Sequence, residues 1–463
     1  MNDRLRRLTW ILVGLFLVLV GQLSYLQIIA ADELTANENN GRTLAEERRF
    51  RRGAIFSREG SVLAESRSVD GGFERIYPQG EIFASVTGFS SPRYGRSGIE
   101  ESANKYLMVK RQAASLREYI NQLAGRGKMG DDVYLSVSER IQRAAVEALG
   151  DKRGAVVALD PKTGDVLALA SYPSYDPNDI DSNFKELRAD ASSPLLDRAT
   201  QGLYPPGSTF KVVTASAALE KGVASPDSVY DGPSELYVSG GKVVNFDNQE
   251  LGKMTLREAF AHSVNTAFAK VGLDVGYDLV GYAKRFGFGE KPPIALPTTA
   301  SSVQPPSDMD KLALAWTAVG QAKLEATPLE MALVAAGIAN GGEIMAPRLI
   351  HEVRSEEGLL QRSFPPTVWR RAVSEKTANA ITDLMVETVE RGTGQAARIR
   401  GVEVAGKTGT AETEGGKPHA WFIGFAPARN AKVAVAVVVE HGGIGGKVAA
   451  PIAKKVIEAT LGD

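Results

Sequence analysis

The sequence predicts a mixed α/β (α+β) fold for most of this 463-residue chain, and two observations carry the prediction. Strand-like apolar segments gather at both ends of residues 131–463, whereas residues 205–390 between them are predicted to be largely helical. Strands at both ends of a helical segment indicate one α/β domain whose sheet is mixed or antiparallel and is closed by both ends of the segment.

Hydrophobic periodicity predicts the elements of this domain in order. Residues 131–150, DDVYLSVSERIQRAAVEALG, predict a strand followed by an amphipathic helix. A hairpin follows, in which GAVVALD and DVLALAS flank the turn PKTG. Near the C-terminal end, VEVAGKTGTAE, AWFIGFAP and KVAVAVVVE predict three more strands, and residues 446–461 predict a final amphipathic helix.

The first 31 residues predict a membrane anchor. Residues 8–31 carry no charge, and as a helix they would be about 36 Å long, enough for a hydrocarbon core of about 30 Å. Arg4, Arg6 and Arg7 precede this run. The positive-inside rule therefore predicts a cytoplasmic segment 1–7, a transmembrane anchor 8–31 and an extracytoplasmic remainder. A cleaved signal peptide is the alternative.

Residues 32–130 differ in character from the domain that follows. They are charged and loop-rich, with short strand-like pieces such as GAIFS and SVLAES, and SLREYINQLAGRGK looks helical. We expect a small separate domain here, followed by the main domain at 131–463.

Composition excludes several function classes. The 54 basic and 55 acidic residues nearly balance, so no basic excess indicates a nucleic-acid partner. The absence of cysteine excludes disulfides and thiolate chemistry. His351 and His441 have no partner at metal-ligand spacing, and we expect no metal and no cofactor. His262 is expected to be structural, and His419 is a weak candidate for lining a cleft.

A Ser-x-x-Lys pair occurs four times, at Ser102–Lys105, Ser182–Lys185, Ser208–Lys211 and Ser239–Lys242. About two matches are expected by chance in a chain of this length, so the surroundings must separate them. The pairs at 102 and 182 lie in charged segments, and the pair at 239 looks like a turn. Only Ser208 follows a Pro-Pro-Gly turn and starts a run whose apolar residues can face a core.

This pair can supply a nucleophile and its base. A helix start at Ser208 would favour developing negative charge, and positions i and i+3 share a helix face, so the Lys211 amine can reach the Ser208 hydroxyl. A serine nucleophile needs a base, and a lysine can serve if burial and neighbouring charge lower its pKa. The alternative, equally consistent with the tetrapeptide, is a capping serine followed by a lysine whose stem covers apolar surface.

Two further segments favour catalysis. AHSVNTAF places Ser263 and Asn265 after GKMTLREAF, which is predicted to be helical. In VAGKTGTAE, strand alternation puts Thr408 and Thr410 on one face beside Lys407, which suits a substrate carboxylate. Gly409 lacks a side chain, so a ligand backbone can approach the strand there. A second KTG at residues 162–164 is explained by turn chemistry.

The order SxxK, SxN, KTG resembles the signature of penicillin-recognising serine acyltransferases. RRGAIFSREGSVLAES, RIYPQG and GIEESANKYL resemble the pedestal motifs of class B penicillin-binding proteins, although Ser57 stands where the first motif often has Asp. VVALDPKTGDVLALASYPSYDPN, ATPLEMALVAAGIANGG and HAWFIGFAP resemble the transpeptidase domain. The resemblance covers residues 42–463. It implies a pedestal at 32–130 and a transpeptidase domain with a five-stranded sheet covered by helices.

The resemblance also implies a reaction, peptidoglycan cross-linking by serine acyl transfer. Ser208 would attack the carbonyl between two D-alanines of a stem peptide, and Lys211 would take its proton. The Ser208 and Thr410 N–H groups would form an oxyanion hole, worth about 3 kcal/mol for each donor. Ser263 and Lys407, the latter as a fixed positive charge, would relay a proton to the leaving D-alanine. Asn265 would hydrogen-bond the backbone of the donor peptide and help to hold Lys211. Thr408 and Thr410 would hold the terminal carboxylate of the donor peptide.

The implied partners are stem peptides, β-lactams and a membrane glycan polymerase of the shape, elongation, division and sporulation (SEDS) family. Alternatives are a class D-like β-lactamase or β-lactam sensor, a D,D-carboxypeptidase, or a non-catalytic scaffold. The anchor and the pedestal argue against a free β-lactamase. Asn265 does so too, because class D enzymes usually have a hydrophobic residue at that position. Every catalytic position of the family motifs carries the expected residue, which argues against a non-catalytic scaffold.

Overall fold

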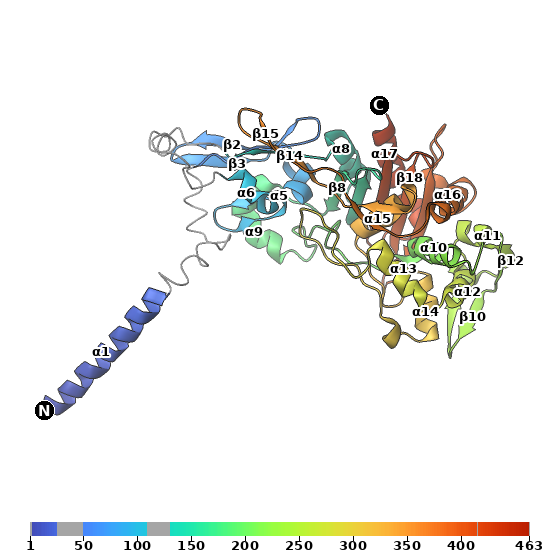
Figure 1. Cartoon of the computed structure of the whole chain (residues 1–463), viewed down its shortest axis with the longest axis horizontal. Coiled ribbons are helices and arrows are strands. Elements are labelled where there is room, and N and C mark those ends of the chain that lie inside the picture. The colour runs from blue at the N-terminus through green and yellow to red at the C-terminus, as the bar shows by residue number, and fades with distance from the viewer. Residues whose placement is uncertain (1, 26–49, 109–129, 414, 463) are drawn as a thin grey trace.

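The computed structural model describes residues 2–25, 50–108, 130–413 and 415–462, and Figure 1 shows how they are arranged. Its central feature is a five-stranded antiparallel sheet of order β17-β18-β19-β7-β8. The strands are β7 (Gly154–Leu159), β8 (Val166–Tyr172), β17 (Ala405–Ala411), β18 (His419–Ala426) and β19 (Val433–Val439). This confirms the predicted sheet, built from both ends of residues 131–463.

Helices cover both faces of this sheet, which explains why its strands are almost continuously apolar. Along β19, Val433, Val435 and Val437 pack into the cluster formed with α8 (Glu139–Leu149) and α17 (Gly445–Leu461). The alternate residues of β19 face the cluster that contains α15 (Pro328–Ala339). The strand therefore needs apolar residues on both faces, with valines on one and mainly alanines on the other.

The middle of the chain is largely helical, as predicted, but short two-stranded sheets interrupt it. Its helices are α10 (Lys211–Lys221), α11 (Leu256–Ala261), α12 (Asn265–Val275), α13 (Asp278–Phe286), α14 (Lys311–Ala318), α15 and α16 (Glu375–Glu390). These sheets pair β9 (Val229–Gly232) with β12 (Gly252–Thr255), β10 (Glu235–Val238) with β11 (Gly241–Val244), and β13 (Glu343–Met345) with β16 (Val368–Arg371). Their strands are only three or four residues long and are partly exposed, so they give no strong periodic signal.

One of these strands corrects a sequence-based prediction. The segment GKMTLREAF was predicted to be helical throughout, but its first four residues form β12. Helix α11 begins at Leu256 because Thr255 caps it. The Thr255 hydroxyl accepts a hydrogen bond from the Glu258 N–H, and the Glu258 carboxylate accepts one from the Thr255 N–H. This capping box fixes where the helix starts.

The pedestal, described over residues 50–108, contributes to a six-stranded sheet of order β15-β14-β6-β1-β2-β3. Its own strands are β1 (Ile55–Phe56), β2 (Val62–Val69) and β3 (Gly72–Ile76), followed by the short hairpin β4 (Ser90–Ser91) with β5 (Gly95–Arg96). The other strands of the sheet, β6 (Asp132–Leu135), β14 (Ile350–Arg354) and β15 (Leu360–Ser363), come from after residue 130. The sheet thus takes strands from both sides of the boundary predicted at 130.

Short helices complete this part of the molecule: α4 (Ala84–Thr87), α5 (Gly98–Ser102), α6 (Asn104–Leu107) and, from after the boundary, α9 (Ile180–Ala189). The helix expected in SLREYINQLAGRGK lies outside the described residues. Tyr77 and Asn178 join the pedestal to the following domain, since the Tyr77 N–H donates to Asn178 Oδ1 and Asn178 Nδ2 donates to the Tyr77 carbonyl.

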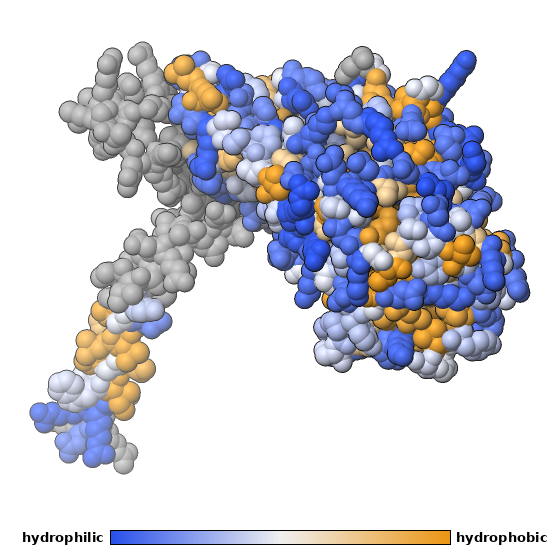
Figure 2. Space-filling view, turned by 45° about the vertical axis from the view of Figure 1, so that its right-hand side comes forward, coloured by the Kyte–Doolittle hydropathy of each residue, from blue (hydrophilic) through white to orange (hydrophobic). Residues whose placement is uncertain are grey.

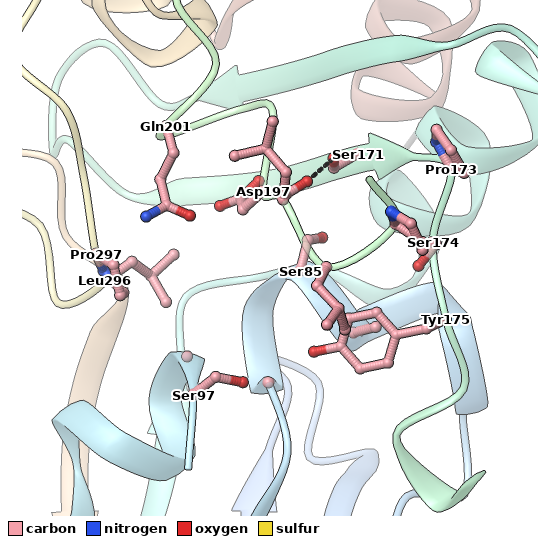
Figure 3. A pocket seen from close by; sticks show the side chains of 16 residues that line it. Ser85, Ser97, Ser171, Pro173, Ser174, Tyr175, Asp197, Gln201, Leu296 and Pro297 are labelled. Carbon is pink, nitrogen blue, oxygen red and sulfur yellow. Dashed lines mark hydrogen bonds between the residues drawn. The ribbon is translucent and has the colours of Figure 1, made fainter. Parts of the chain in front are cut away.

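A cavity of about 70 Å³ lies where the pedestal meets the rest of the chain (Figure 3). Ser85 and Ser97 line it from the pedestal side, opposite Asp197 and Gln201. Burial raises the pKa of Asp197 to about 6, but its carboxylate is already hydrogen-bonded to the Thr200 hydroxyl at 2.5 Å. A local hydrogen bond within the chain therefore accounts for the Asp197 carboxylate.

Helix α1 (Asn2–Ser24) lies away from the remaining described residues (Figure 1). Its apolar side chains from Leu8 to Val20 are exposed, for example Trp10 at 71% and Phe16 at 65%. Within the ranges that the structure describes, no helix has both the length and the apolar character that a membrane crossing requires. Residues 26–31 of the predicted anchor lie outside the described residues.

Candidate active site

A cleft of about 650 Å³ runs beside β17, the edge strand of the five-stranded sheet. Among the residues that line it are five of the eight predicted site residues: Ser208, Ser263, Asn265, Thr408 and Thr410. They come from separate segments of the chain, so only the fold brings them together. Lys211 and Lys407 lie buried beside the cleft, and both are fully enclosed.

Ser208 lies on a 3₁₀ turn (Gly207–Phe210) that precedes helix α10, which begins at Lys211. The predicted helix start is therefore three residues too early. Gly207 permits the entry to this turn because its φ is +54°, in the left-handed region that favours glycine. The Gly207 N–H donates to the Gly320 carbonyl, and the Trp421 indole donates to the Pro205 carbonyl. These bonds fix the turn against its surroundings and leave Ser208 half-buried at the cleft.

Three oxygen atoms surround the Lys211 amine. Lys211 Nζ lies 2.7 Å from the Ser263 carbonyl, 2.7 Å from Asn265 Oδ1 and 3.2 Å from Ser263 Oγ. Among the described residues it makes no hydrogen bond to Ser208, although the sequence predicted that the two groups meet. Two of the three oxygens can only accept, so a neutral amine that donates to both keeps its lone pair for a hydroxyl.

The environment of Lys211 favours that neutral amine. Burial holds the pKa of Lys211 well below its ordinary value, and the charge of Lys407 lowers it further. No ion pair with a carboxylate involves either lysine in the part of the chain that the structure describes. The Phe268 ring, whose centroid lies 5.3 Å from Lys211 Nζ, adds an apolar wall beside the amine.

Ser263 has the backbone conformation that brings it to both lysines. Its φ is +61°, which is uncommon for a residue other than glycine and is often found at functional sites. It lies between the end of α11 and the start of α12. In this position its carbonyl accepts from Lys211, and its hydroxyl accepts from Lys407 Nζ at 2.9 Å. Ser263 is therefore the link between the two amines.

Lys407 differs from the fixed positive charge that the sequence predicted. Burial lowers the pKa of Lys407 to about 7, because no carboxylate compensates the desolvation of its ammonium group among the described residues. Its Nζ also lies 3.2 Å from the Thr408 carbonyl. The charge of Lys407 can therefore change near neutral pH, and an anion bound beside it would favour the protonated form.

Asn265 and the two threonines occupy the positions expected of ligand-binding groups. Asn265 is the first residue of α12; besides holding Lys211, it donates from Nδ2 to the Val244 carbonyl at 2.9 Å. Thr408 and Thr410 both line the cleft, as alternation along β17 predicted. The Thr408 hydroxyl is 2.5 Å from that of Thr393.

Thr393 is a lining residue that the sequence analysis missed. It lies in the loop after α16, where its N–H donates to the Ala261 carbonyl, two residues before Ser263. The preceding glycine allows this approach, since a Cβ on Gly392 would lie 2.1 Å from the same carbonyl. The glycines of the motif RGTG therefore indicate a close backbone contact at Thr393. This signal was present in the sequence and could have identified the residue.

Gly409 does not belong to the residues that line the cleft. A Cβ there would lie 3.0 Å from the Pro206 carbonyl and 2.9 Å from the Trp421 Cβ. The space beside Gly409 is thus filled by the turn that carries Ser208 and by β18. Its lack of a side chain admits the protein's own turn, whereas the sequence analysis expected it to admit a ligand.

The other Ser-x-x-Lys pairs have ordinary structural roles. Ser239 forms the tip of the β10–β11 hairpin, and Ser182 is exposed on α9. Ser102 donates to the Ala295 carbonyl at the surface. The second KTG forms the turn between β7 and β8, as predicted. His419 is buried against Tyr204 and His441 and does not line the cleft, whereas His262 does.

Comparisons with known proteins agree with this geometry. Residues 154–458 match the family model for the penicillin binding protein transpeptidase domain, and residues 52–133 match the model for the penicillin binding protein A dimerisation domain. The chain is 39% identical over 490 residues to the peptidoglycan D,D-transpeptidase PbpA of Mycolicibacterium smegmatis, covering 100% of this chain and 99% of that protein.

Solved structures show the same similarity. Penicillin-binding protein A from Mycobacterium tuberculosis, in a ceftriaxone acyl-enzyme complex, gives a TM-score of 0.85 at 38% identity over 90% of this chain and 99% of that one. The D,D-transpeptidase domain of a peptidoglycan glycosyltransferase from Eggerthella lenta gives 0.83 at 39% identity, over 89% and 99% of the two chains.

Proposed function

The chain belongs to the penicillin-binding protein transpeptidases, a family of peptidoglycan D,D-transpeptidases, and we propose how its residues carry out the acyl transfer. The observation that carries the proposal is the buried pair Lys211 and Lys407, joined through Ser263 beside Ser208. This arrangement offers a nucleophile, a base whose pKa is lowered, and a second amine within one cleft.

In the first step, Ser208 Oγ attacks the carbonyl between the two terminal D-alanines of a donor stem peptide. Neutral Lys211 accepts the hydroxyl proton, directly or through a small movement, since catalytic hydrogen bonds are often long in structures without substrate. The resulting oxyanion is stabilised by the N–H groups of Ser208 and Thr410. Two of the acceptors around Lys211 hold its N–H groups, which leaves the lone pair for this proton.

The tetrahedral intermediate then collapses, and the C–N bond to the terminal D-alanine breaks. The leaving amine receives a proton through Ser263, whose hydroxyl contacts Lys407 at 2.9 Å and Lys211 at 3.2 Å. Thr408 and Thr410 hold the terminal carboxylate, and that negative charge keeps Lys407 protonated. An acceptor amine then attacks the acyl-enzyme carbonyl, the C–O bond to Ser208 breaks, and the proton lost by the amine returns to Ser208 Oγ through Lys211. Asn265 positions the donor backbone.

Similarity over the full length favours transpeptidation over the β-lactamase, sensor and carboxypeptidase alternatives. β-Lactams are proposed to acylate Ser208 in the same way as the donor peptide does. Penicillin-binding protein A from Mycobacterium tuberculosis has been solved as acyl-enzymes with ceftriaxone, imipenem and penicillin G.

The test is covalent labelling of the full-length chain by a fluorescent penicillin. Ser208→Ala should abolish the labelled band, because no other hydroxyl occupies its position on the turn. Ser182→Ala and Ser239→Ala are the matched controls, since each belongs to a Ser-x-x-Lys pair remote from the cleft, and both should label normally. Normal labelling of folded Ser208→Ala would remove Ser208 as the nucleophile.

We propose further that the chain is held at the cell membrane by residues 8–31, with the transpeptidase domain outside. The uncharged run, the arginines before it and the exposed apolar side chains of α1 support this (Figure 2). Protease added to intact spheroplasts should digest the chain after residue 32 and spare the first segment. Complete protection, or a released mature form that begins near Asp32, would contradict the anchor.

A membrane glycan polymerase of the SEDS family is the proposed partner, supported only by the family resemblance. Cross-linking on membranes that contain both proteins should join them, and removal of residues 1–31 should weaken the joining. If the two proteins never cross-link, the proposed partnership is wrong, and the transpeptidase assignment is unaffected.

A further inference from the structure

The turn that carries Ser208 begins at Tyr204, a residue with no part in the acyl transfer described so far. Tyr204 is only 7% exposed. Its N–H donates to the Ala326 carbonyl at 3.1 Å, and its carbonyl accepts from the Ala326 N–H at 2.8 Å. Its hydroxyl donates to Glu440 Oε1 at 2.8 Å. Because Glu440 directly follows β19, this bond ties the start of the turn to the five-stranded sheet.

Glu440 offers this acceptor from a fixed position. Its Oε1 also accepts from Arg198 Nε at 2.8 Å, and its Oε2 lies 2.6 Å from Arg153 Nε. The side chain of Arg198 is fully enclosed, and that of Glu440 is 10% exposed. Burial and the charge of Glu440 raise the pKa of Tyr204, so the hydroxyl keeps its proton and donates it. Such charge-assisted hydrogen bonds are stronger than those between neutral groups, so Tyr204 is held firmly.

The ring of Tyr204 packs against the part of β18 that lies beside Thr410. It is edge-on to His419 and to Trp421, whose ring centroids lie 5.5 and 6.2 Å from its own. Across the sheet, these two residues pair with the two neighbours of Thr410 on β17. The side chain of Tyr204 therefore places the turn of Ser208 against the segment of β17 that carries the Thr410 N–H.

This placement bears on the proposed oxyanion hole, which takes one N–H from the turn, at Ser208, and one from the strand, at Thr410. Both donors must lie about 2.7–3.1 Å from the oxyanion to stabilise it. The two prolines of the turn restrict its internal shape, but they do not set its position on the sheet. A displacement of about 1 Å within a catalytic site can cost about a hundredfold in rate.

We propose that Tyr204 and Glu440 are positioning residues for the acyl transfer. Their hydrogen bond holds the turn of Ser208 in place beside Thr410 and so aligns the two donors of the oxyanion hole. The proposal rests on the proposed roles of Ser208 and Thr410. Among the described residues, those that line the cleft include neither Tyr204 nor Glu440, so substrate binding should not depend on this hydrogen bond. Acylation and deacylation pass through similar oxyanions, and both rate constants should therefore fall in the same ratio when the bond is removed.

The test is the steady-state hydrolysis of N-benzoyl-D-alanyl thioglycolate, a thioester analogue of the donor, by the full-length chain in detergent. The value of kcat is expressed per site that labelled penicillin titrates at saturation. Tyr204→Phe removes the hydroxyl and keeps the ring. We expect kcat to fall about tenfold or more, while KM changes less than about twofold because acylation and deacylation slow together. A purely structural role would instead reduce the number of titrated sites and leave kcat per site unchanged.

Tyr230→Phe is the matched control. The Tyr230 hydroxyl also donates to a carboxylate, that of Asp274, and neither residue is among those that line the cleft. Both kcat and KM should therefore stay at their wild-type values.

Glu440→Asp tests the acceptor. It keeps the negative charge beside Arg198 but is shorter by one methylene, which draws the carboxylate away from the Tyr204 hydroxyl. We expect a similar fall in kcat, and adding Tyr204→Phe to this variant should cost no more than about twofold further. If Glu440→Asp fails to fold, the kinetics of Tyr204→Phe alone decide.

Wild-type kcat per titrated site in Tyr204→Phe, or a loss confined to KM, would overturn the proposal. An undiminished cost of Tyr204→Phe in the Glu440→Asp chain would overturn the part assigned to Glu440. Neither result affects Ser208 as the nucleophile, because that assignment fails only if folded Ser208→Ala is still labelled by penicillin.

Discussion

Two clusters of buried cations lie in this chain, and they differ in what surrounds each charge. In the pedestal, the Glu100 carboxylate contacts both Arg52 and Arg75 at 2.5–2.8 Å. In the cleft, Lys211 and Lys407 share only neutral oxygens, chiefly those of Ser263. Both clusters are desolvated, but only the first contains a buried opposite charge within the residues that the structure describes.

The difference has a direct chemical consequence. Arginine remains protonated in proteins, so the pedestal cluster is a fixed ionic contact between elements. Burial works against ionisation of Glu100, yet Arg75 and Arg52 still hold its pKa below the ordinary value. In the cleft, burial is not compensated, and the lysines become able to release a proton. Burial beside an opposite charge thus keeps the arginines in a fixed ion pair, whereas burial without an opposite charge allows a lysine to act as a base.

Exchanging the cation type in the cleft should have the largest effect. Lys211→Arg keeps the charge but cannot release the proton, so the second-order rate of acylation by a labelled penicillin should fall about a thousandfold or more. Lys407→Arg retains a donor to Ser263 and a permanent charge, so its rate should fall only about ten- to a hundredfold. Equal losses in the two folded variants would show that their roles are wrongly divided.

Removing the counter-charge in the pedestal should instead cost stability. Glu100→Gln leaves two buried arginines uncompensated, and we expect the free energy of unfolding to fall by about 3–5 kcal/mol. Because the pKa of Glu100 is lowered on folding, this advantage of the wild type is present above the unfolded value of about 4.5 and disappears as the pH falls through the folded value.

Chemical denaturation of both chains at neutral and at acid pH measures this difference. The result that would contradict the account is a folded Glu100→Gln chain that is as stable as the wild type at neutral pH. Acylation of Ser208 should be little changed wherever Glu100→Gln remains folded, because the pedestal cluster does not contact the cleft.

A smaller effect on the acylation rate is expected from removing a hydrogen bond between two neutral hydroxyl groups at the cleft. Thr393→Val keeps the shape of the side chain but removes its hydrogen bond to the Thr408 hydroxyl. A bond between neutral groups contributes about 0.5–1.5 kcal/mol, so the acylation rate should fall about two- to tenfold. Thr413→Val is the matched control, because the Thr413 hydroxyl donates to the carbonyl of exposed Lys417 and Thr413 is not among the residues that line the cleft, and it should acylate normally. No change in Thr393→Val would remove Thr393 from the site.

The sequence predicted the five-stranded sheet well because its strands are buried on both faces and their apolar runs are unmistakable. It also separated Ser208–Lys211 from three similar pairs, since the Pro-Pro-Gly turn and the apolar run are local features. It missed β14 and β15, which belong to the other sheet. The pairing of β14 with β6 joins segments that lie far apart in the chain, and such a pairing leaves no local signal.

The charges and contacts of the site residues were harder to predict than which residues form the site. The positive φ of Ser263, which brings its carbonyl to Lys211, depends on how α11 and α12 are connected. The variable charge of Lys407 depends on the absence of a carboxylate among its described neighbours, which only the assembled fold reveals. Gly409 shows the same limit, because its requirement for glycine comes from the turn of Ser208 and from Trp421.

The most direct test of the account is the pH dependence of acylation in the wild type and in Lys407→Met. In the wild type, the rate should rise with pH as Lys211 loses its proton, well below the ordinary lysine value of 10.5. In Lys407→Met the neighbouring charge that lowers the pKa of Lys211 is gone, so the rise should move to higher pH, whatever the maximal rate. A wild-type rise near the ordinary lysine value would contradict the claim that uncompensated burial makes Lys211 the base, and a rise that stays in place in folded Lys407→Met would contradict the part assigned to the charge of Lys407.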